Sequence, residues 1–218
     1  MHGYLADSKS FIYQTEHFSK NFSVFAPDFK GFGSNQGMEK PYSLSDYCDD
    51  VKTYIKENGL VKPHVIAHSF GGRVAVKLAS ENPELFDKIV LTGSAGLKPK
   101  RSVKYHVKHS AFKVLKLFVK KEKLNRFYSK DYLALSPVMK ESFIKIVNEH
   151  LDDRLSLISN PTLIIFGNQD KETPVYMARK FNKKIKNSKL VIIKEAGHFA
   201  FIDRPEKFNW EVEGFLLR

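Results

Sequence analysis

Short apolar runs rich in β-branched residues alternate with helix-like segments along most of this chain, and no other feature constrains its fold as strongly. An alternation of this kind is typical of a mostly parallel sheet with helices packed on both faces. We therefore expect an α/β fold. The five expected strands are residues 22–26, 64–68, 88–92, 161–167 and 189–194.

Helical spacing separates most of these strands. Leu44, Tyr47 and Val51 recur at intervals of three or four residues, which favours a helix that starts at Ser43 or Ser45 and stops at a glycine near position 59. Further helices are expected over residues 74–79, over residues 174–185 and after Pro205.

The alternation stops between residues 97 and 158, where apolar positions keep a helical period but no convincing strand occurs. A plain loop of about 60 residues is unusual in a compact domain, so we predict an inserted helical lid. The chain has 218 residues and is 42% hydrophobic, which suffices for one domain with an insertion. The expected organisation is a core in two parts, residues 1–96 and 159–218, with the lid at 97–158.

The strongest local signal for chemistry is the segment 65–72, Val-Ile-Ala-His-Ser-Phe-Gly-Gly. A buried strand leads into a tight turn and then a helix, with the small residues Ala67 and Gly71 two positions on either side of Ser69. Such a turn strains the serine backbone, and the helix that follows directs N–H groups at developing negative charge. We interpret it as a nucleophile elbow, and a glycine-rich turn without catalytic function is the alternative.

A serine hydroxyl needs a base that is oriented by a carboxylate. Asp170 follows the strand expected at 161–167, and His198 follows the strand expected at 189–194. Both residues come just past the carboxyl ends of strands, at the sheet edge where open α/β folds place active sites. The order of serine, aspartate and histidine along the chain fits the same arrangement.

Together these motifs resemble an α/β-hydrolase-fold serine hydrolase with a helical lid, of the esterase and lipase type, and they also resemble carbon–carbon bond hydrolases. The resemblance covers nearly the whole chain and implies the α/β-hydrolase fold. The matching segments are His2-Gly3-Tyr4, residues 28–33, the turn at Ser69, Asp170 with Thr173-Pro174, and Gly197-His198.

The resemblance also implies functions for individual residues. Ser69 would be the nucleophile, His198 the general base and then acid, and Asp170 the partner that holds the imidazole. The main-chain N–H groups of Tyr4 and Phe70 would form the oxyanion hole. The residues expected to support this site are His2, Gly3, His68 and Gly71.

The expected reaction is the cofactor-independent cleavage of a small carboxylic ester or related acyl substrate through an acyl-enzyme. Hydrolysis of a carbon–carbon bond by the same triad, and a non-catalytic ligand-binding protein with this fold, stay open as alternatives. No nucleotide cofactor is expected, because no glycine-rich phosphate loop continues into Gly-Lys-Ser/Thr. No metal is expected either, because Cys48 is the single cysteine and no Cys/His cluster has zinc-ligand spacing.

The formal net charge of +12 is concentrated in one stretch. Residues 98–130 hold twelve Lys or Arg and one acidic residue, so the rest of the chain is nearly neutral. A basic helix with an apolar stripe can attract an acidic substrate, lie on an anionic membrane surface, or simply expose its lysines to water. We favour the last interpretation and leave peripheral membrane contact open. Because lysine dominates the stretch, we expect no nucleic-acid partner.

Location and assembly are less constrained. No run of residues is long and apolar enough for a membrane helix, so no integral membrane segment is expected. The single cysteine and the absence of a secretory pattern at the start favour a cytoplasmic protein. The expected partner is a small-molecule substrate, and the chain is expected to be a monomer or a homodimer.

The start of the sequence departs from the family pattern. In that pattern the His-Gly pair follows the third strand of the sheet, whereas here Met1 alone precedes His2. We therefore expect the N-terminal strands of the fold to be absent and this chain to be a fragment or late-start version of a longer protein. A buried sheet without these strands would leave main-chain groups unpaired, at about 1 to 3 kcal/mol each.

Overall fold

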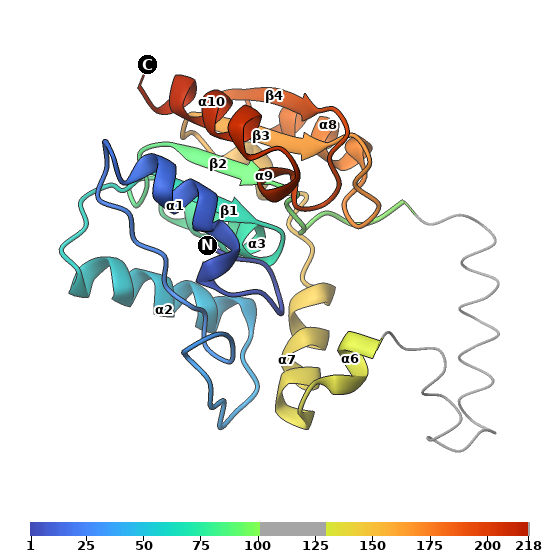
Figure 1. Cartoon of the computed structure of the whole chain (residues 1–218). Helices are drawn as coiled ribbons and strands as arrows, with labels where there is room; N and C mark the ends of the chain where they lie inside the picture. Colours follow the sequence, from blue (N-terminus) through green and yellow to red (C-terminus); the bar gives the residue numbers. More distant parts are fainter. Residues whose placement is uncertain (101–129, 218) are drawn as a thin grey trace.

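Four parallel strands form the sheet of the computed structural model, which describes residues 1–100 and 130–217 (Figure 1). The strands lie side by side in the order in which they occur along the chain. They are β1 (Val65–His68), β2 (Ile89–Thr92), β3 (Thr162–Gly167) and β4 (Ser188–Ile193). The predicted parallel α/β sheet is confirmed, and each of these strands lies close to its predicted bounds.

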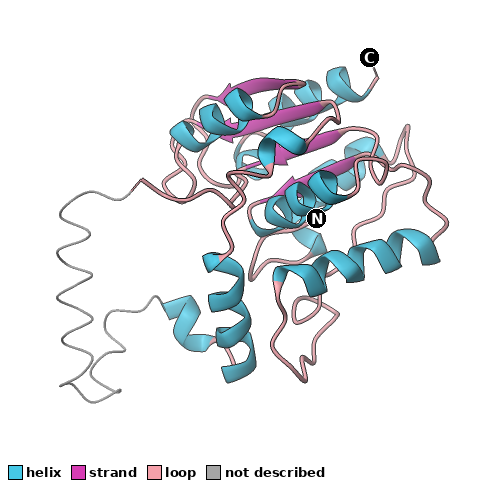
Figure 2. Cartoon of the chain, turned by 180° about the vertical axis from the view of Figure 1, so that it is seen from behind, coloured by secondary structure: helices cyan, strands magenta, loops and turns pink. Residues whose placement is uncertain are grey.

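Helices cover both faces of the sheet (Figure 2). On one face, α3 and α8 pack on the strands and α2 packs against α3. On the other face, α9 and α10 pack on β3, and α1 packs against them. The bounds are α1 (Ile12–Phe18), α2 (Leu44–Glu57), α3 (Phe70–Glu81), α8 (Val175–Lys184), α9 (Ala200–Asp203) and α10 (Pro205–Leu216), with a 3-10 turn, η1 (Ser8–Phe11), before α1.

Alternate side chains of the strands enter two separate apolar clusters. Leu91 and Ile164 join the cluster on the α3 and α8 face, whereas Val90, Leu163 and Ile165 join the cluster under α9 and α10. Successive residues of a strand point to opposite faces of the sheet. Because both faces are covered, the middle strands β2 and β3 are buried along their whole length and are mostly apolar.

Residues 22–26 form no strand, and the prediction of a fifth strand there was wrong. A strand needs a hydrogen-bonded neighbour, and an apolar groove of about 460 Å³ lies between this segment and β1. Ile66 lines one side of the groove, and Val24 and Phe25 line the other and remain 39% and 45% exposed. The apolar pattern therefore identified a segment that favours a sheet, but no partner strand lies next to it among the described residues.

Met1 pairs with the free edge of β1. Its amino group donates to the carbonyl oxygen of Ile66 at 2.7 Å, and the N–H of His68 donates to the carbonyl oxygen of Met1 at 3.0 Å. Burial lowers the pKa of the Met1 amino group to about 5. These two hydrogen bonds hold the first residues of the chain beside the end of β1.

The described part of the segment between β2 and β3 contains helices and no strand. Its elements are α6 (Lys130–Ala134), α7 (Pro137–Asn148) and a 3-10 turn, η3 (Leu155–Leu157). The hydroxyl of Ser136 caps α7 by accepting the N–H of Met139 at 3.2 Å, and Pro137 is the first residue of the helix. Residues 101–129, which carry most of the basic stretch, lie outside the described residues.

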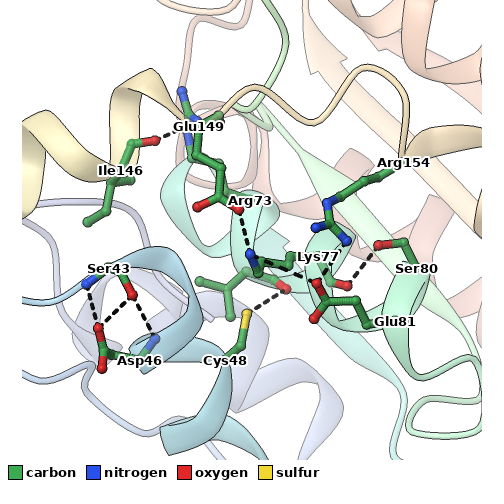
Figure 3. A network of polar contacts seen from close by, with 11 residues as sticks. Ser43, Asp46, Cys48, Arg73, Lys77, Ser80, Glu81, Ile146, Glu149 and Arg154 are labelled. Atoms are coloured by element: carbon green, nitrogen blue, oxygen red, sulfur yellow. Dashed lines mark hydrogen bonds and ion pairs between the residues drawn. The ribbon is translucent and has the colours of Figure 1, made fainter.

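Arg73 on α3 ties the end of α7 to the core (Figure 3). Its guanidinium group donates to the carbonyl oxygens of Ile146 at 3.0 Å and Glu149 at 2.8 Å. Lys77, one turn later on α3, pairs with the carboxylate of Glu149 at 2.5 Å. Both basic side chains are buried. The carbonyl groups that accept from Arg73 stand at the end of a helix, where the last C=O groups have no intrahelical donor.

We predict that Arg73→Met lowers the free energy of unfolding by about 2 kcal/mol, because buried carbonyl groups lose a charged donor. Urea denaturation followed by circular dichroism measures the change. Arg179→Met is the matched control, since Arg179 is exposed on α8 and its replacement should stay within about 0.5 kcal/mol of wild type. Equal stability of the two variants would contradict the prediction.

Candidate active site

Ser69 occupies a strained turn between β1 and α3. Its backbone angles are φ 49° and ψ −107°, a region that residues with a side chain rarely adopt. Tight packing holds the turn in place. A methyl group at Gly71 would lie 2.4 Å from the carbonyl oxygen of Met1, and one at Gly72 would lie 2.2 Å from the hydroxyl of Ser94. The small residues around Ser69 thus allow main-chain segments to approach it closely.

Asp170 and His198 come together at the carboxyl ends of β3 and β4. The Nδ1 atom of His198 lies 2.9 Å from Oδ2 of Asp170. The carboxylate also accepts hydrogen bonds from the main-chain N–H groups of Glu172 and Thr173 and from the Thr173 hydroxyl, at 2.8 to 2.9 Å. Burial favours a higher pKa for Asp170, but the hydrogen bonds from His198 and Thr173 outweigh it and lower the pKa. Asp170 is therefore an ionised acceptor that orients the imidazole.

His198 lies against the turn that carries Ser69. Its carbonyl oxygen lies 3.2 Å from Nε2 of His68, and the two imidazole rings have centroids 4.6 Å apart. A methyl group at Gly93, whose φ is +50°, would lie 2.9 Å from the same carbonyl oxygen. The main chain just before Gly93 also accepts the N–H of Ser69, at 3.2 Å, through Thr92. The loop after β2 therefore connects the serine and the histidine.

His68 is a buried and neutral histidine. It is 1% exposed, and its ring packs against Phe199 and Phe201 as well as His198. Burial and the nearby His198 lower the pKa of His68 to about 3, so the ring carries no charge near neutral pH. The geometry fits a supporting contact with the loop of His198 and not a base.

His2 orders the loop that runs over Ser69. Its Nδ1 lies 2.8 Å from the carbonyl oxygen of Gly3, and its Nε2 accepts the N–H of Phe29 at 2.9 Å. Burial lowers the pKa of His2, which fits a neutral ring with one donor and one acceptor. A methyl group at Gly3 would lie 2.9 Å from Nδ1 of His68 and 3.5 Å from Cβ of Ser69, so glycine permits this approach.

Two main-chain donors are available at this point. Within the described part of the chain, neither the N–H of Tyr4 nor that of Phe70 has a hydrogen-bond acceptor. Phe70 is the first residue of α3, where helix geometry leaves the N–H groups without intrahelical partners and the dipole favours negative charge. The two residues predicted to form an oxyanion hole therefore lie on the two segments that meet at Ser69.

Sequence reasoning assigned no function to several residues that shape the site. Thr173 supplies two of the hydrogen bonds to Asp170, and Gly93 makes room for the main chain of His198. Asp203 accepts the N–H of Gly197 at 2.7 Å, beside His198. A threonine three residues after a candidate acid was a usable signal, whereas the close approach at Gly93 links parts of the chain that are far apart in sequence.

The family model for the alpha/beta hydrolase fold matches residues 1–118 and 95–205 of the chain. This chain belongs to the α/β hydrolase fold family. The predicted fold and family are thereby confirmed for this α/β hydrolase. None of its described helices has the length and apolar character needed to cross a membrane.

Two bacterial proteins are similar in sequence to this α/β hydrolase over most of its length. The AB hydrolase superfamily protein YisY of Bacillus subtilis is 26% identical over 96% of this chain and 87% of its own length. The 2-hydroxymuconate semialdehyde hydrolase of Pseudomonas putida is 26% identical over 91% of this chain and 78% of its own length. An esterase structure from Exiguobacterium antarcticum covers 100% of this chain and 90% of its own, with a TM-score of 0.79 and 23% identity, which shows a shared fold.

We predict that Ser69→Gly is about 1 kcal/mol more stable than Ser69→Ala, because glycine relieves the backbone strain and alanine keeps it. Both variants lose the hydroxyl, so the difference between them isolates the turn. Urea unfolding of the two purified proteins measures it. An alanine variant as stable as the glycine variant would show that the turn is not strained.

Asp170→Asn should lower the stability of the folded protein at neutral pH, and the loss should be smaller at acidic pH. The folded-state pKa of Asp170 lies below its ordinary value of 3.8, so its ionised form stabilises the fold above that value. This contribution is lost as the pH falls through the lower pKa of the folded state. Urea midpoints of wild type and variant should therefore differ at pH 7, and the difference should shrink as the pH falls below 3.8. A difference in urea midpoint that stays constant across this pH range would contradict the expectation.

Proposed function

We propose that this protein is a cofactor-independent serine hydrolase that cleaves a small carboxylic ester or related acyl substrate through an acyl-enzyme. The observation that carries the proposal is the Asp170–His198 hydrogen bond beside the strained turn of Ser69. An aspartate that orients a histidine next to a serine on such a turn is the arrangement that activates a hydroxyl as a nucleophile.

The first half of the reaction forms the acyl-enzyme. His198 accepts the proton of the Ser69 hydroxyl on Nε2 while Nδ1–H donates to Asp170, and Oγ attacks the carbonyl carbon of the ester. The carbonyl oxygen becomes an oxyanion that accepts hydrogen bonds from the N–H groups of Tyr4 and Phe70. His198 then returns the proton to the leaving alcohol, and the acyl group remains on Ser69.

The second half repeats these steps with water. His198 removes a proton from the water molecule, the hydroxide attacks the acyl carbon, and the same two N–H groups hold the oxyanion. Collapse of the intermediate releases the carboxylic acid and returns the proton to Ser69. In this scheme His2, Gly3, His68 and Gly71 support the site through the contacts that fix the loops around Ser69.

We propose that residues 97–158 form a lid, and the support for it comes from its described helices α6 and α7. A hollow of about 820 Å³ lies between α6 and α7 on one side and the loop after Tyr4 on the other. Its lining combines apolar and polar side chains. The residues that line the hollow are Leu5, Ala6, Asp7, Lys9, Ser10, Gly31, Phe32, Gly33, Gln36, Ala134, Leu135 and Met139.

Hydrolysis of a carbon–carbon bond is the second candidate. It is favoured by the similarity to 2-hydroxymuconate semialdehyde hydrolase, which is 26% identical over 91% of this chain. The same serine, histidine and oxyanion donors would serve a substrate whose leaving group is carbon. Comparing kcat/KM for a ring-fission dienone and for a series of p-nitrophenyl esters of increasing acyl length separates the two reactions.

We further propose a reducing, cytoplasmic location for this enzyme. Cys48 is buried and free, and burial raises the pKa of its thiol to about 12. A buried thiol of this kind behaves as a small apolar residue and needs no oxidising environment.

We predict that a fluorophosphonate probe labels the wild-type protein and fails to label Ser69→Ala. Asp170→Ala and His198→Ala should lower kcat on p-nitrophenyl acetate by at least about 1000-fold, since the triad acts as a unit. Ser80→Ala is the matched control, because Ser80 lies three turns along α3 from the site and its hydroxyl donates to the carbonyl of Lys77. A wild-type protein that is folded, unlabelled and without turnover would instead favour a ligand-binding protein.

A further inference from the structure

Tyr4 joins the loop over Ser69 to α7. Its hydroxyl donates to the carbonyl oxygen of Met139, in the first turn of α7, at 3.1 Å. Its ring packs against Phe143, one turn further along the same helix, with centroids 5.2 Å apart. Burial raises the pKa of the Tyr4 hydroxyl to about 12, so it stays protonated and remains a donor. One side chain thus makes both a polar and an aromatic contact with α7.

The same ring also contacts the other oxyanion residue. The rings of Tyr4 and Phe70 are 5.5 Å apart and nearly perpendicular, and Phe32 packs against Tyr4 at 4.8 Å. Edge-to-face pairs at these distances are favourable and directional. The side chains of both proposed oxyanion donors therefore belong to one aromatic cluster, and Phe143 of α7 is part of its wall.

The helix that receives Tyr4 is itself fixed to the core at two further points. In its middle, the hydroxyl of Ser142 accepts the N–H of Tyr42 at 2.8 Å. At its end, Arg73 holds the carbonyl oxygens of Ile146 and Glu149 (Figure 3). α7 is therefore a rigid support for Tyr4.

The loop has few other restraints at this position. Leu5, the next residue, has a positive φ of 61°, and a single turn bond joins the N–H of Ala6 to the carbonyl oxygen of Gly3 at 3.2 Å. The Gly3 carbonyl oxygen belongs to the same peptide group as the Tyr4 N–H, and it also lies 2.8 Å from Nδ1 of His2. These two contacts hold the Gly3 end of the peptide group, and the Tyr4 side chain holds its other end, so the direction of the Tyr4 N–H depends on both.

We propose that Tyr4 is a positioning residue whose side chain, anchored on Met139 and Phe143 of α7, aligns its own main-chain N–H for the oxyanion. This inference rests on the proposed serine hydrolase function and adds that α7 takes part in setting the rate of the chemical steps. A substrate group or a substitution that displaces α7 would then change kcat through the oxyanion hole as well as KM through the pocket.

Tyr4→Phe tests the proposal because it removes the hydroxyl and leaves the N–H and the ring in place. Loss of a whole oxyanion donor costs about 100- to 1000-fold in kcat, so a misaligned donor should cost about 10-fold, with KM for p-nitrophenyl acetate within about twofold of wild type. Tyr13→Phe is the control, since Tyr13 is 47% exposed on α1 and should retain full activity.

A tetrahedral inhibitor separates positioning from a general structural effect. Phenylboronic acid forms a tetrahedral adduct with an active serine and so uses the oxyanion hole, whereas a planar carboxylic acid product does not depend on it in the same way. In Tyr4→Phe, inhibition by the boronic acid should weaken about as much as kcat falls, with inhibition by the product acid unchanged. Equal weakening of both inhibitors, or an unchanged kcat, would overturn the proposal.

The outcomes also distinguish this inference from the proposed function. If fluorophosphonate fails to label Ser69 in the wild type, the hydrolase proposal fails first. If wild type is labelled and Tyr4→Phe is destabilised in thermal unfolding, the double variant Tyr4→Phe with Phe143→Leu decides the matter. Additive losses of kcat from the two substitutions would overturn the link through α7, and a loss no larger than that of either single variant would support it.

Discussion

The close approach of main-chain segments around Ser69 is the constraint on which the rest of the site depends. A turn with φ 49° and ψ −107° persists because neighbouring segments leave it no alternative. Gly71 and Gly72 admit the first residues of the chain and the loop after β2, and Gly93 admits the main chain of His198. Each of these contacts excludes a side chain. The small residues therefore allow close packing around Ser69.

The titratable groups near the turn differ in charge at neutral pH. Asp170 stays ionised because hydrogen bonds outweigh its burial, while His2 and His68 are neutral because burial dominates. Positive charge on these two histidines would oppose a protonated His198 during turnover. Of these three histidines, His198 is hydrogen-bonded to a carboxylate, and it is the one that the proposed mechanism requires to gain and lose a proton.

Much of this arrangement could be predicted from local sequence, and the reasons for the failures are physical. Ser69, Asp170 and His198 each follow a recognisable apolar strand, and parallel strands bring their carboxyl ends to one edge. Residues 22–26 have the composition of a strand, but a strand also requires a neighbour, which composition does not encode. The contacts of Gly93 with His198 and of Arg73 with α7 join distant parts of the chain and have no local signature.

The order of the strands has a consequence for how the protein acquires its activity. Because β1 to β4 lie side by side in the order in which they occur along the chain, each of the later strands pairs with the strand that precedes it in sequence. The serine is carried by the first strand and the histidine follows the last. Ser69 and His198 therefore come from the two ends of this run of four strands, and the proposed reaction requires all four strands to be in place.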